Sequence, residues 1–167
     1  MTGSETPAPP PAPKARLTAI TLDQTSIAHV NHHIDHEREV AIFDILDGNV
    51  FALDGRDEGP YTLVLSILDE KLMFTVGNAT VRELYVHGLS MGPFKRVIRD
   101  YFLVCDSYYE AIRAAPPARI QAIDMSRRAL HDDGSRLLGE KLNGRITVDF
   151  DTARRLFTLI AALHWRG

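Results

Sequence analysis

The chain is poor in cysteine and has no long apolar run. Its 167 residues contain one cysteine, Cys105, so no internal disulfide can form. No apolar run reaches the roughly 18 residues that a membrane-spanning helix needs. The first fifteen residues lack the apolar core of a signal peptide. These absences argue against a helical membrane protein and a disulfide scaffold, and we expect a cytoplasmic protein.

Several signatures of catalysis and cofactor binding are also missing. The chain has no glycine-rich phosphate loop, no GxSxG motif and no CxxC pair. Cys105 falls in an apolar helical pattern, which favours a buried side chain over a nucleophile. We therefore expect no cofactor, and the sequence argues more against an enzyme than for one.

The composition is that of an ordinary globular domain. Hydrophobic residues make up 45% and charged residues 25% of the chain, which has a net charge of -3. Residues 16–92 carry five basic and twelve acidic side chains, whereas residues 93–167 carry thirteen and nine. This basic surplus is small beside that of domains that bind nucleic acid. We expect the two halves to neutralise each other within one fold or between two copies.

Two regions are predicted. Residues 1–15 are rich in proline and alanine and have no apolar periodicity, which is typical of a disordered arm with polyproline II character. Residues 16–167 are long enough for a single domain with a sizeable core.

Alternating apolar residues predict a small antiparallel β-meander. The first strand begins at Tyr61, and Asp69-Glu70 form a two-residue turn into a strand from Leu72 to Val76. A third strand ends near His87-Gly88. Residues 17–22 form a further strand. Such a sheet has one face that needs cover.

A long amphipathic helix over residues 91–114 is the expected cover. Its apolar residues recur every 3.5 positions, as in a helix seam. Those residues are Phe94, Ile98, Tyr101, Cys105, Tyr108 and Ile112.

Further helices are expected before and after this cover. Asp35 is the predicted cap of a helix through Asp47, with Val40, Ile42, Phe43, Ile45 and Leu46 as its apolar stripe and Gly48 in the left-handed position after it. A helix over 118–130 is predicted to break at Asp132-Asp133-Gly134, and a short one to run from Ser135 to Leu142. Asp149 or Asp151 caps a last helix that is apolar on nearly all sides over 156–163. The expected fold is thus α+β, with a helical C-terminal region.

Four histidines lie within eight residues and raise the question of a metal. They are His29, His32, His33 and His36. Pairs four residues apart would suit zinc on a helix, but the segment precedes the predicted Asp35 cap and contains no HExxH motif. We predict a polar loop and no metal site. His36 with Glu37 is the candidate acid–base pair, and capping with surface pairing is the simpler interpretation.

Two arginine pairs are the candidate anion site. Arg127 and Arg128 precede His131, while Arg154 and Arg155 open the last helix, where positive charge opposes the helix dipole. Guanidinium groups bind phosphate or carboxylate in a bidentate manner, so an anion between the pairs is one interpretation. Structural salt bridges are the other.

Several segments together form a recognisable pattern, which comprises residues 36–44, 100–102, 107–112, 123–125 and 149–167, together with Cys105, Arg127, Arg128 and His131. This pattern resembles the uncharacterised protein family numbered 0262 in the UPF series, found in alphaproteobacteria. The resemblance covers the chain from about Leu17. It implies a small bacterial protein of unknown function, and it offers no catalytic residue to transfer.

Three functions follow from these patterns as hypotheses. The first is a non-enzymatic regulatory or scaffolding protein that self-associates as a homo-oligomer, since the helices carry excess apolar surface. The alternative is an enzyme or sensor acting on a small anion through the arginine pairs. The third is weak RNA binding, which the mild basic surplus favours least.

Overall fold

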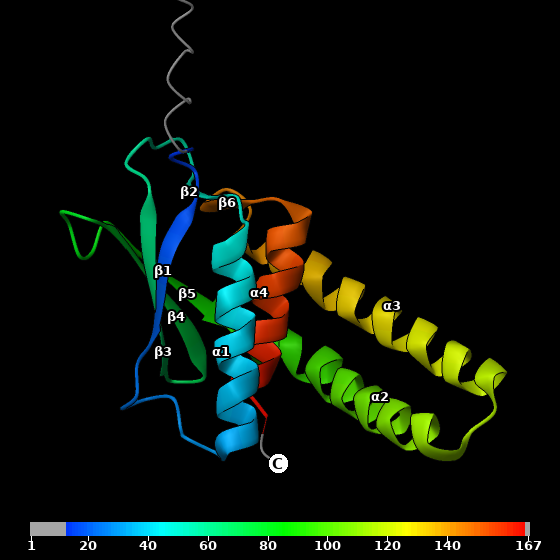
Figure 1. Ribbon diagram of the computed structural model, residues 1–167. Coiled ribbons are helices and arrows are strands. Elements are labelled where there is room, and N and C mark those ends of the chain that lie inside the picture. Colours follow the sequence, from blue (N-terminus) through cyan, green and yellow to red (C-terminus); the bar gives the residue numbers. More distant parts are fainter. Residues whose placement is uncertain (1–12, 166–167) are drawn as a thin grey trace, which may run out of the picture.

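The computed structural model describes residues 13–165 (Figure 1). Most of the predicted arm, residues 1–12, lies outside the described residues. The end of that arm meets the domain, because the backbone N–H of Phe51 donates to the carbonyl of Ala15 at 3.0 Å. The described residues form a mixed four-stranded sheet, a two-stranded sheet and four α-helices, which confirms the predicted α+β class.

The larger sheet contains the predicted meander. Its strand order is β1-β3-β4-β5, with antiparallel pairing from β3 to β5. Strand β1 was not assigned a partner from sequence, and it pairs parallel to β3. Asp69 and Glu70 both have positive φ angles, of 50° and 61°, as a tight two-residue hairpin turn requires. The strands are β1 (Leu17–Leu22), β3 (Tyr61–Leu68), β4 (Lys71–Asn78) and β5 (Tyr85–Ser90).

The helices form two groups. In Figure 1, α1 and α4 lie beside each other next to the sheet, whereas α2 and α3 form a hairpin that extends away from it. The short strands β2 (Phe51–Leu53) and β6 (Ile146–Val148) pair antiparallel. The helices are α1 (His32–Asp47), the 3-10 helix η1 (Gly92–Phe94), α2 (Lys95–Ala114), α3 (Pro117–Leu142) and α4 (Phe150–Leu163).

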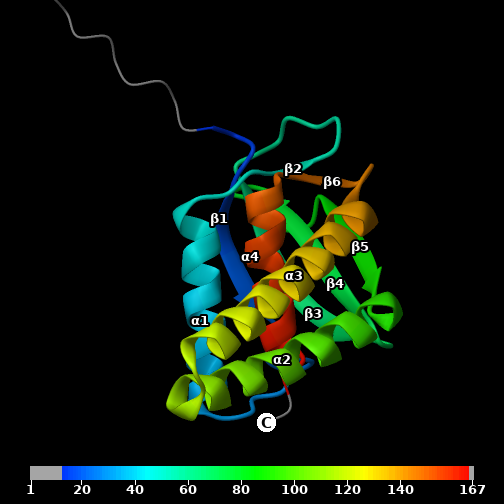
Figure 2. The same ribbon diagram turned by 90° about the vertical axis from the view of Figure 1, so that its right-hand side faces the viewer.

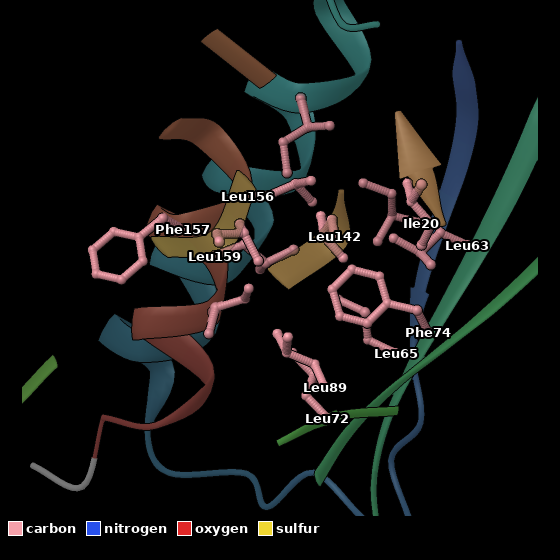
Figure 3. Packing of buried hydrophobic residues seen from close by; sticks show 14 of the residues in the cluster. Ile20, Leu63, Leu65, Leu72, Phe74, Leu89, Leu142, Leu156, Phe157 and Leu159 are labelled. Atoms are coloured by element: carbon pink, nitrogen blue, oxygen red, sulfur yellow. The ribbon is translucent and has the colours of Figure 1, made fainter. Parts of the chain in front are cut away.

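The core lies between α4 and the sheet. Figure 3 shows Leu156 and Leu159 of α4 facing Leu65 and Phe74 of the sheet, and all four side chains are fully buried. This position explains why α4 is apolar on nearly all sides. The long helix α2 meets the core at its N-terminal end through Ile98, and its further length packs on α3.

Helix α3 is continuous, so the predicted break at Asp132-Asp133-Gly134 and the separate helix starting at Ser135 are both wrong. Gly134 allows the Phe157 ring of α4 to approach the α3 backbone. A Cβ atom at Gly134 would lie 2.7 Å from Cε1 of Phe157 and closer still to its Cζ. The glycine is therefore required for close helix packing, and the helix continues through it.

Helix α1 begins earlier than predicted. Asn31 is its cap, because its Oδ1 accepts a hydrogen bond from the N–H of Ile34 at 2.9 Å. Asp35 lies in the first turn, where a carboxylate favours the helix dipole. The earlier start places His32 and His33 on the helix, whereas a loop was predicted.

The end and the apolar stripe of α1 also differ from prediction. Gly48 is extended, with a φ angle of -166°, and the side chain of Asn49 instead donates to the carbonyl of Ile45 at 2.9 Å. Val40 and Phe43 are exposed, at 42% and 68%. The buried face follows a four-three-four spacing and consists of Ile34, Arg38, Ala41 and Ile45.

Candidate functional site

Helices α3 and α4 bring the predicted arginines around one open pocket of about 460 Å³. All five residues predicted for an anion site line it. Figure 2 shows α2 and α3 crossing in front of α4, which places the middle of α3 over the N-terminal half of α4. The lining residues are Tyr101, Arg127, Arg128, His131, Asp151, Arg154, Arg155 and Thr158.

The same spacing occurs on both helices. Arg127 and His131 are four residues apart on α3, as are Arg154 and Thr158 on α4, so each pair shares one helix face. Of the two caps predicted for the last helix, Asp149 and Asp151, the structure has Asp149, whose Oδ1 accepts from the N–H of Thr152 at 2.9 Å, while Asp151 lies in the first turn. The cap fixes where α4 starts and hence where its arginines lie.

Asp124 holds the two arginines of α3. It accepts from Nη2 and Nε of Arg127 at 2.6 and 3.2 Å and lies 3.1 Å from Nη2 of Arg128. The hydrogen bond from Arg127 holds the pKa of Asp124 below its usual range. The Arg127 guanidinium also lies 4.5 Å from the centre of the Tyr108 ring. Arg127 is thus oriented by two neighbours.

The two arginines of α4 have separate partners. Nε of Arg154 lies 3.5 Å from a carboxylate oxygen of Asp132, and Nη1 of Arg155 donates to the carbonyl of Gly48. Of the five N–H donors that a guanidinium carries, Arg127 uses two in hydrogen bonds to Asp124 and Arg155 uses one, whereas Arg128 and Arg154 are held by ion pairs. Most of the donors of these four arginines therefore make no hydrogen bond within residues 13–165.

Positive charge prevails around the pocket. Its lining holds four arginines and one carboxylate, that of Asp151. Asp124 and Asp132, which hold three of the arginines, reduce the surplus to one positive charge. The pocket therefore matches the charge of a small anion.

His131 is a half-buried member of the site. Its Nε2 lies 2.8 Å from Oγ1 of Thr158, and its ring packs against Phe157 and Tyr101 at 5.3 and 5.5 Å between ring centres. Burial lowers its pKa, and Arg154 and Arg127 lower it further, while Asp132 opposes them. Because an ordinary histidine pKa is about 6.5, His131 is neutral at pH 7.

The two ring nitrogens of His131 differ. The Thr158 hydroxyl donates to the carbonyl of Arg154 at 3.2 Å. Nε2 must then donate to Thr158, and the unprotonated Nδ1 is buried without a hydrogen-bond partner among residues 13–165. Within the described part of the chain, no group therefore orients this ring from its second nitrogen, as the third member of a catalytic triad would.

The lowered pKa of His131 predicts a pH-dependent stability. The unfolded chain binds this proton more tightly, so the contribution of His131 to stability is fully present above about pH 6.5 and declines as the pH falls. Thermal melting of the wild type should therefore lose more stability between pH 7 and pH 5 than melting of His131→Asn. The exposed His36→Asn is the control, and an identical pH profile for His131→Asn and the wild type would contradict the assignment. Burial also lowers the pKa of His87. Part of the loss of stability at low pH should therefore persist in every variant.

The remaining predicted candidates lie apart from the arginines. His36 is exposed and does not line the arginine pocket, whereas Glu37 lines a neighbouring pocket between α1, α2 and α4. Nδ1 of His29 lies 2.7 Å from a carboxylate oxygen of Asp35. Within residues 13–165, no group of three or more histidine, cysteine, aspartate or glutamate side chains is arranged to hold a metal ion.

Three lining residues were missed from the sequence: Tyr101, Asp151 and Thr158. Asp151 was considered only as a possible cap of the last helix. Tyr101 was assigned to the apolar seam of the long helix, and Thr158 lies within the apolar segment 156–163. Thr158 is the one polar residue of that segment, four positions after Arg154. That spacing was the available signal, since it places both residues on the same face of α4.

Comparison with known proteins identifies the family. The family model described as "Uncharacterised protein family (UPF0262)" matches residues 14–166. A UPF0262 protein of Xanthobacter autotrophicus is 52% identical over 160 residues, which cover 95% of this chain and 98% of the relative. One from Nitrobacter winogradskyi is 51% identical, covering 91% of both chains. A third, from Rhodopseudomonas palustris, is 50% identical and covers 97% of this chain and 99% of its own.

No solved structure matches the chain. Among residues 13–165, no helix combines the length and apolar character needed to cross a membrane.

Proposed function

The chain belongs to UPF0262, and we propose that it binds a small anion bearing a phosphate or carboxylate group in the pocket between α3 and α4. The observation that carries this proposal is the convergence of two arginine pairs, from separate helices, on one open pocket. Structural salt bridges alone would not require both pairs to face the same space. Arginine is suited to this role because its planar fork matches phosphate and carboxylate geometry.

The proposal is for binding and sensing. His131 contacts Thr158 through Nε2, and none of residues 13–165 bonds its Nδ1 to orient it as a catalytic base. The proposed contacts to the ligand come from the arginines, because the unprotonated Nδ1 of His131 is buried. An anion bound beside His131 would favour its protonation. We therefore expect binding to take up a proton below neutral pH.

Removing single arginines tests this function. Arg127→Ala and Arg154→Ala should each weaken the binding of inorganic phosphate by about tenfold or more, because hydrogen bonds to charged groups contribute about 1.5–3 kcal/mol. Isothermal titration calorimetry at constant ionic strength measures the change. Arg136→Ala is the matched control, since Arg136 also lies on α3 and pairs with Asp133 at 3.3 Å but does not line this pocket. Equal phosphate affinity in all three variants and the wild type would refute the proposal.

Self-association is a second candidate function, favoured by apolar side chains on the projecting α2–α3 hairpin. Leu103, Tyr109 and Met125 are exposed at 60%, 60% and 65%. Such side chains cluster in interfaces between subunits. Sedimentation velocity should show an oligomer that Leu103→Ser shifts toward the monomer, while the exposed Glu140→Ser leaves it unchanged. A wild type that remains monomeric at high concentration would exclude this function.

A further inference from the structure

The arginine pocket adjoins a second, apolar pocket of about 270 Å³. Tyr101 and Thr158 line both pockets, so the two spaces adjoin at these side chains. The first pocket is polar and suits a charged group, whereas the second is lined mainly by aromatic and aliphatic residues. Ligand sites in proteins commonly combine an apolar cavity with a few convergent polar groups. Together the two pockets have that composition.

The second pocket lies between α1, α2 and α4. Its floor is formed by the small side chains Ala161 and Ala162 of α4, which leave space that larger residues would fill. Trp165 also lines the pocket and packs edge-on against Phe102, with ring centres 4.5 Å apart. Burial raises the pKa of the Cys105 thiol, so that wall of the pocket is uncharged. The other lining residues are His33, Ile34, Glu37, Asp106 and Tyr109.

One face of α4 runs beneath both pockets. Arg154, Thr158 and Ala162 follow at intervals of four residues, so they lie in a row along the helix. At a rise of 1.5 Å per residue, this row is about 12 Å long. A ligand bound at the arginines can therefore reach the apolar pocket by lying along α4.

We propose that the ligand is an elongated amphipathic anion. Its phosphate or carboxylate group binds the arginines between α3 and α4, and its uncharged apolar tail passes Tyr101 and Thr158 to lie on Ala162. This inference rests on the proposed function, because it extends the same site and names the chemical class of its ligand.

The acidic rim of the second pocket restricts the tail. Glu37 and Asp106 both line that pocket and would repel a second anionic group at the far end of the ligand. A dianion with charges at both ends should therefore bind more weakly than a ligand with one charged end. This restriction separates the proposed ligand from dicarboxylates of similar length.

A homologous series tests the tail. Calorimetric titrations of the full-length protein with inorganic phosphate, butyl phosphate and hexyl phosphate should show affinity rising about threefold to fourfold per added methylene, the increment expected for burying a CH₂ group. A terminal carboxylate added to hexyl phosphate should reverse this gain. Binding of all three compounds with equal affinity would overturn the tail proposal and leave the anion site standing. Binding of none of them would overturn both.

Two variants locate the tail. Ala162→Leu fills the apolar pocket, so it should abolish the dependence on chain length while phosphate binding stays unchanged. Tyr109→Ala removes a wall that is 60% exposed, which the fold should tolerate, and it should reduce the increment per methylene. Circular dichroism melting verifies that both variants are folded. A chain-length dependence that persists unchanged in both folded variants would place the tail elsewhere and overturn the inference.

Discussion

Replacing Gly134 with alanine is expected to destabilise the fold by about 1–3 kcal/mol, the usual cost of overpacking a well-packed core. The added methyl group would overlap the Phe157 ring, which already packs against Tyr101 and His131. The ring cannot move without displacing both neighbours. The substitution should therefore also disturb the pocket that Tyr101 and His131 line.

Gly139→Ala is the matched control for this result. Gly139 lies on the same helix, and an added Cβ there would meet no atom within 4 Å. Alanine at this position should stabilise the helix by about 0.5–1 kcal/mol, because glycine loses more backbone entropy on folding. Urea denaturation of both variants measures the difference. Equal effects of the two substitutions would show that Gly134 is not a close-packing position.

Arg38→Ala should destabilise the protein by about 3 kcal/mol. Arg38 is 5% exposed and donates hydrogen bonds to three backbone carbonyls. The acceptors are Ala28 at 3.0 Å, Ala162 at 3.1 Å and Leu163 at 3.5 Å. Each buried acceptor left without a partner costs about 1–3 kcal/mol.

The position of Arg38 explains why a charged residue is buried there. Ala162 and Leu163 end α4, where carbonyl groups lack helical partners and the helix dipole favours a cation. Arg38 thus holds the C-terminus of α4 to α1. The neighbouring Glu39 is exposed, so Glu39→Ala should change stability by less than about 0.5 kcal/mol. If urea denaturation gives the same stability for both variants, the contacts of Arg38 contribute nothing measurable.

The features predicted correctly are those that depend on neighbours in sequence. The alternation of apolar and polar residues predicts the antiparallel meander, and the position of the turn at Asp69-Glu70 follows from the two strands that flank it. The capping by Asp149 is likewise local, because a cap acts within one helical turn. The two ends of α1 are local features that were nonetheless missed, whereas the wrongly predicted break in α3 depends on a residue distant in sequence. The sequence around Gly134 predicts a helix break, because the residue that explains the glycine, Phe157, lies on another helix and is not apparent from the local sequence.

The candidate site was predictable only in part for the same reason. The sequence contains both arginine pairs and His131, but their convergence depends on how α3 crosses α4. Thr158 was overlooked because an apolar helix face dominated its segment. The apolar pocket beside it required the spatial arrangement of three helices, and its floor at Ala162 carries no signal in the sequence.

Selenate, a tetrahedral dianion that resembles phosphate, offers the most direct test of the anion site. Anomalous diffraction from crystals grown with dilute selenate would locate the ion. The proposed function predicts a selenium peak between α3 and α4, with selenate oxygens about 3 Å from guanidinium nitrogens of Arg127 and Arg154. This peak should disappear in the Arg127→Ala/Arg154→Ala double variant. A pocket without a peak while selenate occupies another site, or a peak that persists in the double variant, would contradict it.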